Sequence, residues 1–75
     1  MDELMEILEN LRPDVDFSAE TALVTGGVLQ SFDIVSLVAE INDTFDIEIT
    51  PVDLVPENFN SADAIWAMIE RKQDE

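Results

Sequence analysis

Residues 31–45 read SFDIVSLVAEINDTF, and this stretch carries the strongest periodic signal in the chain. Its apolar side chains recur every three or four positions, which is the spacing of one face of an α-helix. The residues on that face are Ile34, Leu37, Val38, Ile41 and Phe45. We therefore predict a helix from about Ser31 to Phe45 with this face buried.

A second amphipathic pattern lies toward the N-terminus. Its acids fall away from the apolar face and occupy the first turns, where the helix dipole favours negative charge. Its apolar residues are Leu4, Ile7, Leu8 and Leu11. The sequence predicts a helix here that Pro13 ends.

Between residues 14 and 27 the helical periodicity lapses, which predicts a long connection. Gly26 and Gly27 permit a sharp turn near its end, because glycine adopts backbone angles that other residues avoid. We expect four apolar side chains to anchor the connection to the core, namely Val15, Phe17, Leu23 and Val24.

Residues 46–49 alternate briefly between polar and apolar, which indicates an extended connector with its two isoleucines pointing inward. Thr50 then suits a helix cap and Pro51 suits the first helical position. We expect Pro56 to stop this helix within one or two turns, so that it is short.

The last pattern predicts a longer helix capped by Asn60 or Ser61 and ending at the basic pair Arg71 and Lys72, whose charges complement the helix dipole. Its apolar face carries Ala62, Ile65, Trp66 and Ile69. Together the patterns predict an all-α fold over residues 1–75, a single domain. Its architecture is a small four-helix bundle with a long loop between helices 1 and 2 and a short third helix.

Composition restricts the classes of partner. The chain has 75 residues and a net charge of −15, with eighteen carboxylates against Arg12, Arg71 and Lys72. Nucleic acids and anionic membranes bind through Lys and Arg, so both are disfavoured. The negative charge instead favours a protein partner with a positive patch. The N-terminus lacks the basic start and apolar run of a secretion signal, so we expect a cytoplasmic address, and we also expect a monomer.

Ser31 is the most informative polar residue, because the chain has no His, Cys or Tyr. Without a base to activate a nucleophile, an enzyme is disfavoured. Residues 43–48 lack the ligand spacing of a calcium loop, so we expect no metal site. Ser31 stands where a glycine-containing turn enters a helix, and serine is a favoured cap there, so helix capping alone is the simpler interpretation of this residue.

The predicted helix 31–45 also carries a second apolar strip away from its buried face, formed by Phe32, Val35 and Ala39. Acids flank the strip at Asp33, Glu40 and Asp43. One interpretation is that Phe32 and Val35 tuck under the loop 14–27. The other is a docking face, in which the strip supplies contact area and the acids steer basic partners.

Residues 29–35, LQSFDIV, followed by residues 45–49, FDIEI, resemble the acyl carrier proteins. The resemblance extends over nearly the whole chain, and its ordering is more specific than the short serine motif alone. It implies a four-helix carrier in which Ser31 holds a covalent 4'-phosphopantetheine arm, which a phosphopantetheinyl transferase attaches from coenzyme A. The arm would carry acyl or aminoacyl groups as thioesters.

The resemblance also implies partners: the transferase, an adenylating acyl or aminoacyl ligase, and acyl transferases or synthases of fatty acid or secondary metabolite biosynthesis. These would dock on helix 31–45, at the strip and acids already described. Phe32, in the setting of Leu29, Ile34 and Val35, makes the chain look more like the D-alanyl carriers of teichoic acid modification or the carriers that serve stand-alone adenylating ligases. Two positions depart from the family pattern, because Gln30 and Ser36 stand where acids are usual.

A function of another class is a non-covalent acidic interaction module that occupies a basic groove. That hypothesis fits the charge and needs no modified serine. Under it, Ser31→Ala leaves partner binding intact, whereas charge reversal at Asp33, Glu40 and Asp43 abolishes it.

Overall fold

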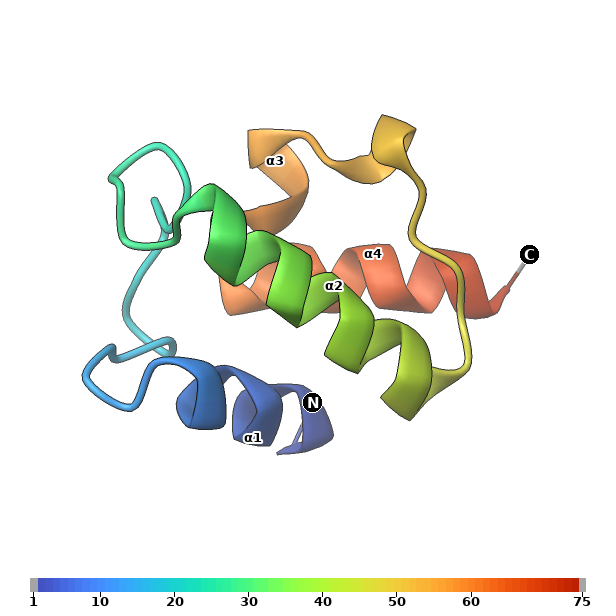
Figure 1. The fold of residues 1–75 in the computed structure, drawn as a ribbon, viewed down its shortest axis with the longest axis horizontal. Helices are drawn as coiled ribbons and strands as arrows, with labels where there is room; N and C mark the ends of the chain where they lie inside the picture. Colours follow the sequence, from blue (N-terminus) through green and yellow to red (C-terminus); the bar gives the residue numbers. More distant parts are fainter. Residues whose placement is uncertain (1, 75) are drawn as a thin grey trace.

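Four α-helices and one short 3-10 helix form the regular structure of residues 2–74, which are the residues that the computed structural model describes (Figure 1). The helices are α1 (Asp2–Leu11), α2 (Ser31–Phe45), η1 (Pro51–Asp53), α3 (Pro56–Phe59) and α4 (Ala62–Gln73). No strand occurs between residues 2 and 74. The predicted all-α fold, with its long connection and short third helix, is confirmed.

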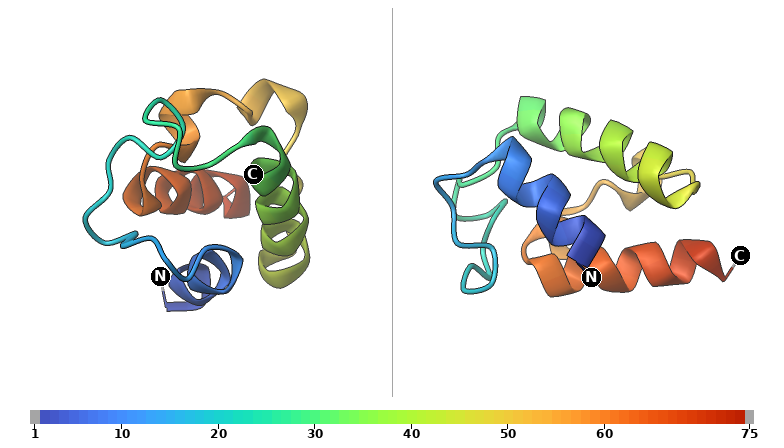
Figure 2. Two further views of the ribbon diagram at one scale, coloured as in Figure 1. Left: turned by 60° about the vertical axis from the view of Figure 1, so that its left-hand side comes forward. Right: turned by 90° about the horizontal axis from the view of Figure 1, so that it is seen from below.

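The three longer helices surround one core. Helix α1 packs against both α2 and α4, and α3 packs against α4. The connection from α1 to α2 lies at one end of the molecule, and the C-terminal end of α4 points to the opposite end (Figures 1 and 2). Because the connection covers the end where α2 begins, it also determines the surroundings of Ser31.

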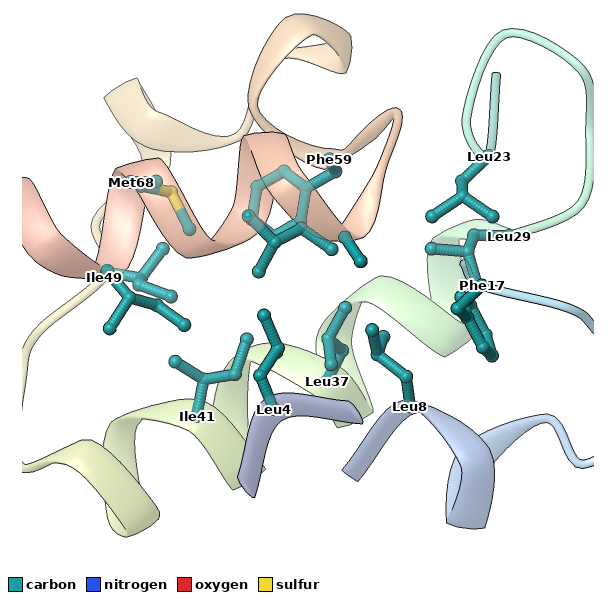
Figure 3. Packing of buried hydrophobic residues seen from close by; sticks show 13 residues of the cluster. Leu4, Leu8, Phe17, Leu23, Leu29, Leu37, Ile41, Ile49, Phe59 and Met68 are labelled. Atoms are coloured by element: carbon teal, nitrogen blue, oxygen red, sulfur yellow. The ribbon is translucent and has the colours of Figure 1, made fainter. Parts of the chain in front are cut away.

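The core consists of thirteen buried apolar residues, and no polar or charged residue among those described is buried. Every α-helix contributes, and so do the connections (Figure 3). The core residues are Leu4, Leu8, Phe17, Leu23, Leu29, Leu37, Ile41, Ile49, Phe59, Ala62, Ile65, Met68 and Ile69. Burying one large apolar side chain stabilises a fold by about 1.5–3 kcal/mol, so these residues supply the main driving force for folding.

The long connection is ordered by its apolar anchors, as predicted. Phe17 and Leu23 are buried, while Val15 and Val24 pack against the core from its edge. Leu29, just before α2, is buried as well. The backbone of the connection is therefore held close to the bundle along most of its length.

Asn60 adds polar restraints to the same connection. Its backbone oxygen accepts a hydrogen bond from the Leu23 N–H at 2.8 Å, and its Oδ1 accepts from the Val24 and Thr25 N–H groups, both at 3.0 Å. Asn60 lies between α3 and α4. These bonds fix the connection to that junction.

Both glycines are required by the local backbone. A Cβ at Gly26 would lie 2.5 Å from the Ala22 carbonyl oxygen, and Gly27 has a φ of 75°. The first contact is too close for any side chain, and the second angle lies in the left-handed region that disfavours them. The predicted sharp turn before α2 is confirmed.

The predicted helix start is confirmed, with Thr50 as the cap and Pro51 at the first position, but the expectation that Pro56 stops this helix was wrong. Pro51 begins the 3-10 helix η1, and Pro56 begins α3 instead of ending a helix. Proline is tolerated at a first helical position because its missing N–H would have no intrahelical partner there. Asp53 closes the η1 turn, since its Oδ2 accepts from Thr50 N at 3.0 Å and Thr50 Oγ1 at 3.1 Å.

The predictions for the connector 46–49 and for the cap of α4 agree with the structure. Ile49 is buried and Ile47 packs against the core, so both connector isoleucines point inward. Of the two candidate caps of α4, Ser61 is the one used, because its Oγ accepts a hydrogen bond from Ala64 N at 3.0 Å.

Candidate functional site

Ser31 is exposed and occupies the first helical position of α2. The capping position belongs to Gln30, whose φ and ψ of −97° and 170° are those of extended backbone. The interpretation of Ser31 as the helix cap was therefore wrong, because its backbone is already helical. Among the hydrogen bonds within residues 2–74, none involves the Ser31 hydroxyl, so this oxygen is available for chemistry.

Gln30 is used to stabilise the turn. Its Nε2 donates a hydrogen bond to the Gly27 carbonyl oxygen at 3.0 Å, and its backbone N–H donates to Asp33 Oδ2 at 3.1 Å. The second bond is one half of a capping box, in which a side chain of the first turn reaches back to the cap. The position before Ser31 thus contributes turn geometry and no charge.

Arg12 connects the end of α1 to the segment that contains Ser31. Its Nη1 donates to the Val28 carbonyl oxygen at 2.9 Å and to Asp33 Oδ2 at 3.2 Å. Its Nε also lies 3.3 Å from Asp14 Oδ1. The hydrogen bond between Arg12 and Asp14 lowers the pKa of Asp14 and raises that of Arg12.

Phe32, Val35 and Ala39 are all exposed on α2, the first two with 79% and 67% of their surface accessible. The interpretation that Phe32 and Val35 tuck under the loop was therefore wrong. The connection uses its own apolar residues, among them Phe17, to reach the core. Large exposed apolar side chains that share one helix face are typical of a contact surface.

The three predicted docking acids are placed differently. Glu40 and Asp43 are exposed on α2 beside the strip. The Asp33 side chain is only 16% exposed, and its carboxylate pairs with Arg12. Asp33 therefore has a structural partner within the chain, and Glu40 and Asp43 are the two acids of this group that face solvent.

Two hollows adjoin α2. A groove of about 480 Å³ between α1 and α2 is lined partly by carboxylates, including Glu3, Glu6 and Glu40. A smaller apolar pocket of about 110 Å³ lies between α2, the connection and α3, and its lining residues are Val24, Ile34, Leu54, Val55, Pro56 and Phe59. The apolar pocket is far below the volume of about 300 Å³ at which small-molecule sites usually begin.

Among residues 2–74, no group of three or more acidic side chains is arranged to hold a metal ion. Within the same range, no helix has both the length and the apolar character needed to cross a membrane.

Sequence reasoning missed the roles of Arg12 and Asn60. A signal for Arg12 was present, because it is the only cation before residue 71 in a strongly acidic chain. Its position directly after α1 also places it near any structure that follows the first helix. Asn60 gave no comparable signal, since its hydrogen bonds join residues that are 35 and 36 positions apart.

Comparison with known proteins adds an independent finding. The chain is 31% identical over 67 residues to a D-alanyl carrier protein of Lactococcus lactis subsp. lactis, which covers 89% of this chain and 80% of that protein. It is 28% identical over 76 residues to the D-alanyl carrier protein of Lactococcus lactis subsp. cremoris, and this match covers 99% of this chain and 96% of that protein. No family profile and no solved structure matches the chain.

Proposed function

Because this chain belongs to the D-alanyl carrier proteins, a family of acyl carrier proteins, we propose that it carries its cargo as a thioester on a 4'-phosphopantetheine arm bound to Ser31. Carrier proteins are not catalysts, so the chain is not an enzyme. The observation that carries the proposal is the exposed Ser31 hydroxyl at the start of α2. The chain has no Cys, and the arm would supply the thiol.

The surroundings of Ser31 suit the phosphodiester of such an arm. Ser31 is at the first position of a 15-residue helix, where unpaired N–H groups and the helix dipole stabilise an anion. The nearest acid in the helix, Asp33, is paired with Arg12. A negative group on Ser31 is therefore favoured locally even though the chain as a whole is strongly acidic.

Attachment of the arm is a displacement at phosphorus. A bond forms between Ser31 Oγ and the phosphorus that bears pantetheine, and the pyrophosphate bond of coenzyme A breaks. The hydroxyl proton passes to the transferase, and the adenosine bisphosphate leaves with the bonding electrons. This chain contributes the exposed hydroxyl and the surface on which the transferase docks.

D-alanine is the cargo that we propose, because both relatives are named as D-alanyl carriers. The cavities support a small, polar cargo. The apolar pocket beside α2 has a volume of only about 110 Å³, and the larger groove carries three carboxylates, those of Glu3, Glu6 and Glu40, among its lining residues. A long acyl chain would have no apolar interior to enter without displacing core side chains.

The partners that we propose are a phosphopantetheinyl transferase and an adenylating ligase, each with a basic patch beside an apolar contact. The apolar strip of α2 would supply contact energy, and Glu40 and Asp43 would accelerate encounter with the basic patch. We further propose that residues 1–75 act as one carrier domain, as a cytoplasmic monomer.

Aminoacylation of the loaded protein tests the cargo. With a D-alanine-activating ligase and ATP, the phosphopantetheinylated protein should form a D-alanyl thioester that hydroxylamine cleaves. Mass spectrometry should show this product when the wild-type protein is incubated with D-alanine. The Ser31→Ala variant should give no such product under the same conditions. Octanoate with a fatty-acid-activating ligase serves as the comparison. More efficient loading of octanoate than of D-alanine would contradict the proposed cargo.

A further inference from the structure

Arg12 forms contacts on both sides of Ser31 in the sequence. It follows α1 directly, and its backbone N–H continues the helical pattern by donating to the Leu8 carbonyl oxygen at 2.9 Å. Its guanidinium then reaches Val28, three residues before Ser31, and Asp33, two residues after it. A rigid helix end is thereby joined to both flanks of the serine.

One carboxylate oxygen joins these contacts to the helix start. Asp33 Oδ2 accepts from Arg12 Nη1 at 3.2 Å and from the Gln30 N–H at 3.1 Å. Gln30 is the cap residue, so the same oxygen determines where α2 begins. Both bonds involve an ionised group, which makes them stronger than bonds between neutral groups.

The local charge pattern makes Arg12 difficult to replace. It is the only cation before residue 71, and the Asp33 side chain is 16% exposed. Without Arg12, the Asp33 carboxylate would lie mostly out of water with no opposite charge, and the Val28 carbonyl oxygen would lose its partner. The segment from Val28 to Asp33 would then keep the burial of Leu29, the bond from the Leu29 N–H to the Leu23 carbonyl oxygen at 2.7 Å, and the bonds of Gln30 to Gly27 and Asp33.

We propose that Arg12 is a positioning residue for the loading of Ser31. It holds the segment from Val28 to Asp33 against the end of α1, so that the backbone that carries Ser31 is already ordered when the transferase binds. Such pre-organisation raises the rate of the chemical step, because this backbone need not be ordered during the reaction. The inference rests on the proposed function of Ser31.

Arg12→Gln tests the inference, with Arg71→Gln as the control. Both variants lose one positive charge, but Arg71 contacts Asn58 at 3.3 Å and has no bond to the Ser31 segment. Asp33→Asn is the second variant. It keeps the size of the side chain and removes the charge that Arg12 binds, so it tests the same contact if Arg12→Gln does not fold.

Amide hydrogen exchange provides a readout that does not depend on loading. In Arg12→Gln, the amides of Gln30 and Ile34 should exchange about tenfold faster than in wild type, the factor expected for loss of one charge-assisted hydrogen bond. The amides of α4 should be unchanged, and Arg71→Gln should match wild type at Gln30 and Ile34. Unchanged exchange at both amides in Arg12→Gln would overturn the inference.

Loading kinetics provide the second readout, measured well below the melting temperature of each variant. Arg12→Gln and Asp33→Asn should each lower kcat by about tenfold with little rise in KM. The effects of the two substitutions on kcat should be less than additive in the double variant, because both remove the contact between Arg12 and Asp33. A general loss of stability would not change kcat of the folded protein at this temperature.

Electrostatics alone predicts a different result. Removing a cation from an acidic carrier should improve its encounter with a basic transferase, equally for Arg12→Gln and Arg71→Gln. A wild-type kcat in Arg12→Gln would therefore overturn the inference and leave the function of Ser31 untouched. A wild-type protein that cannot be loaded would overturn the proposed function and this inference with it.

Discussion

The side chains beside Ser31 divide into those that hold the local structure and those that face solvent. Gln30 and Asp33 are both engaged in hydrogen bonds within the chain, whereas Phe32 and Val35 are largely exposed. The surface next to the hydroxyl is therefore mainly apolar. The acids that remain free for partners begin further along α2, at Glu40.

Phe32→Ala and Val35→Ala should weaken productive binding of the transferase without unfolding the protein. Both side chains are exposed, so the free energy of unfolding should change by less than about 0.5 kcal/mol. Loss of a central apolar contact should weaken binding of the transferase by roughly 1–2 kcal/mol, seen as a higher KM. Thermal unfolding and transferase kinetics measure the two quantities.

Val52→Ala is the matched control for that prediction, because Val52 is 82% exposed but lies in η1. Its KM should equal that of wild type. An equal rise in KM for Val52→Ala and Val35→Ala would contradict a docking surface confined to the strip on α2.

The sequence was sufficient to place Ser31 at the start of a helix, because the apolar periodicity of residues 31–45 begins there. It was not sufficient to identify the cap. Serine and several other residues suit a cap, and the choice depends on backbone angles that the preceding turn imposes. Here the Gly27 turn and the Asp33 carboxylate give that position to Gln30.

At the scale of elements, helix bounds were predictable where periodicity and a single breaker agree. Helix α2 spans Ser31–Phe45 as expected, and α1 ends at Leu11, before Pro13. The region from Pro51 to Phe59 was not predictable in the same way, because two prolines both suit a helix start. Long-range contacts help to determine the helix bounds in this region. Lys72 Nζ lies 2.6 Å from Asp53 Oδ2, and this ion pair ties α4 to η1.

This tie should make stability depend on pH through Asp53. The hydrogen bond from Lys72, and then that from the Thr50 N–H, lower the pKa of Asp53 in the folded protein. A carboxyl group whose pKa is lower in the folded than in the unfolded protein stabilises the fold at pH values above its unfolded pKa, which is about 3.9 for Asp. This contribution disappears as the pH falls through the pKa of the folded protein. Asp53→Asn should therefore destabilise the protein most above about pH 5 and progressively less below about pH 4.

Denaturant unfolding of wild type and Asp53→Asn at several pH values measures this difference. Glu57→Gln is the control, because Glu57 is exposed in the adjacent helix α3. A difference between wild type and Asp53→Asn that grows as the pH falls would contradict the assigned direction of the pKa shift.

At the scale of the whole molecule, charge opposes the compact state. Eighteen carboxylates face three cations, and the molecule measures only 32 × 23 × 19 Å. At an ionic strength of about 0.01 M the Debye length is about 30 Å, so carboxylates repel one another across the entire protein. Two of the cations, Arg12 and Lys72, are used to join elements, which leaves most of the acids without a cation to pair with.

The melting temperature should therefore rise with sodium chloride between about 0.01 M and 0.15 M, over which the Debye length falls to about 8 Å. Scanning calorimetry across this range measures the effect. Sodium sulfate at equal ionic strength is the control, because sulfate also stabilises proteins by exclusion from their surface. A melting temperature that stays flat in chloride and rises only in sulfate would show that screening is not the cause.

The central claim is that Ser31 carries the arm, and intact-protein mass spectrometry after incubation with coenzyme A and a broad-specificity phosphopantetheinyl transferase tests it most directly. Wild type should gain the mass of one phosphopantetheinyl group, located in the peptide that contains Ser31, and Ser31→Ala should gain none. A wild-type protein that gains no mass, or a Ser31→Ala variant that gains it equally, would contradict the claim.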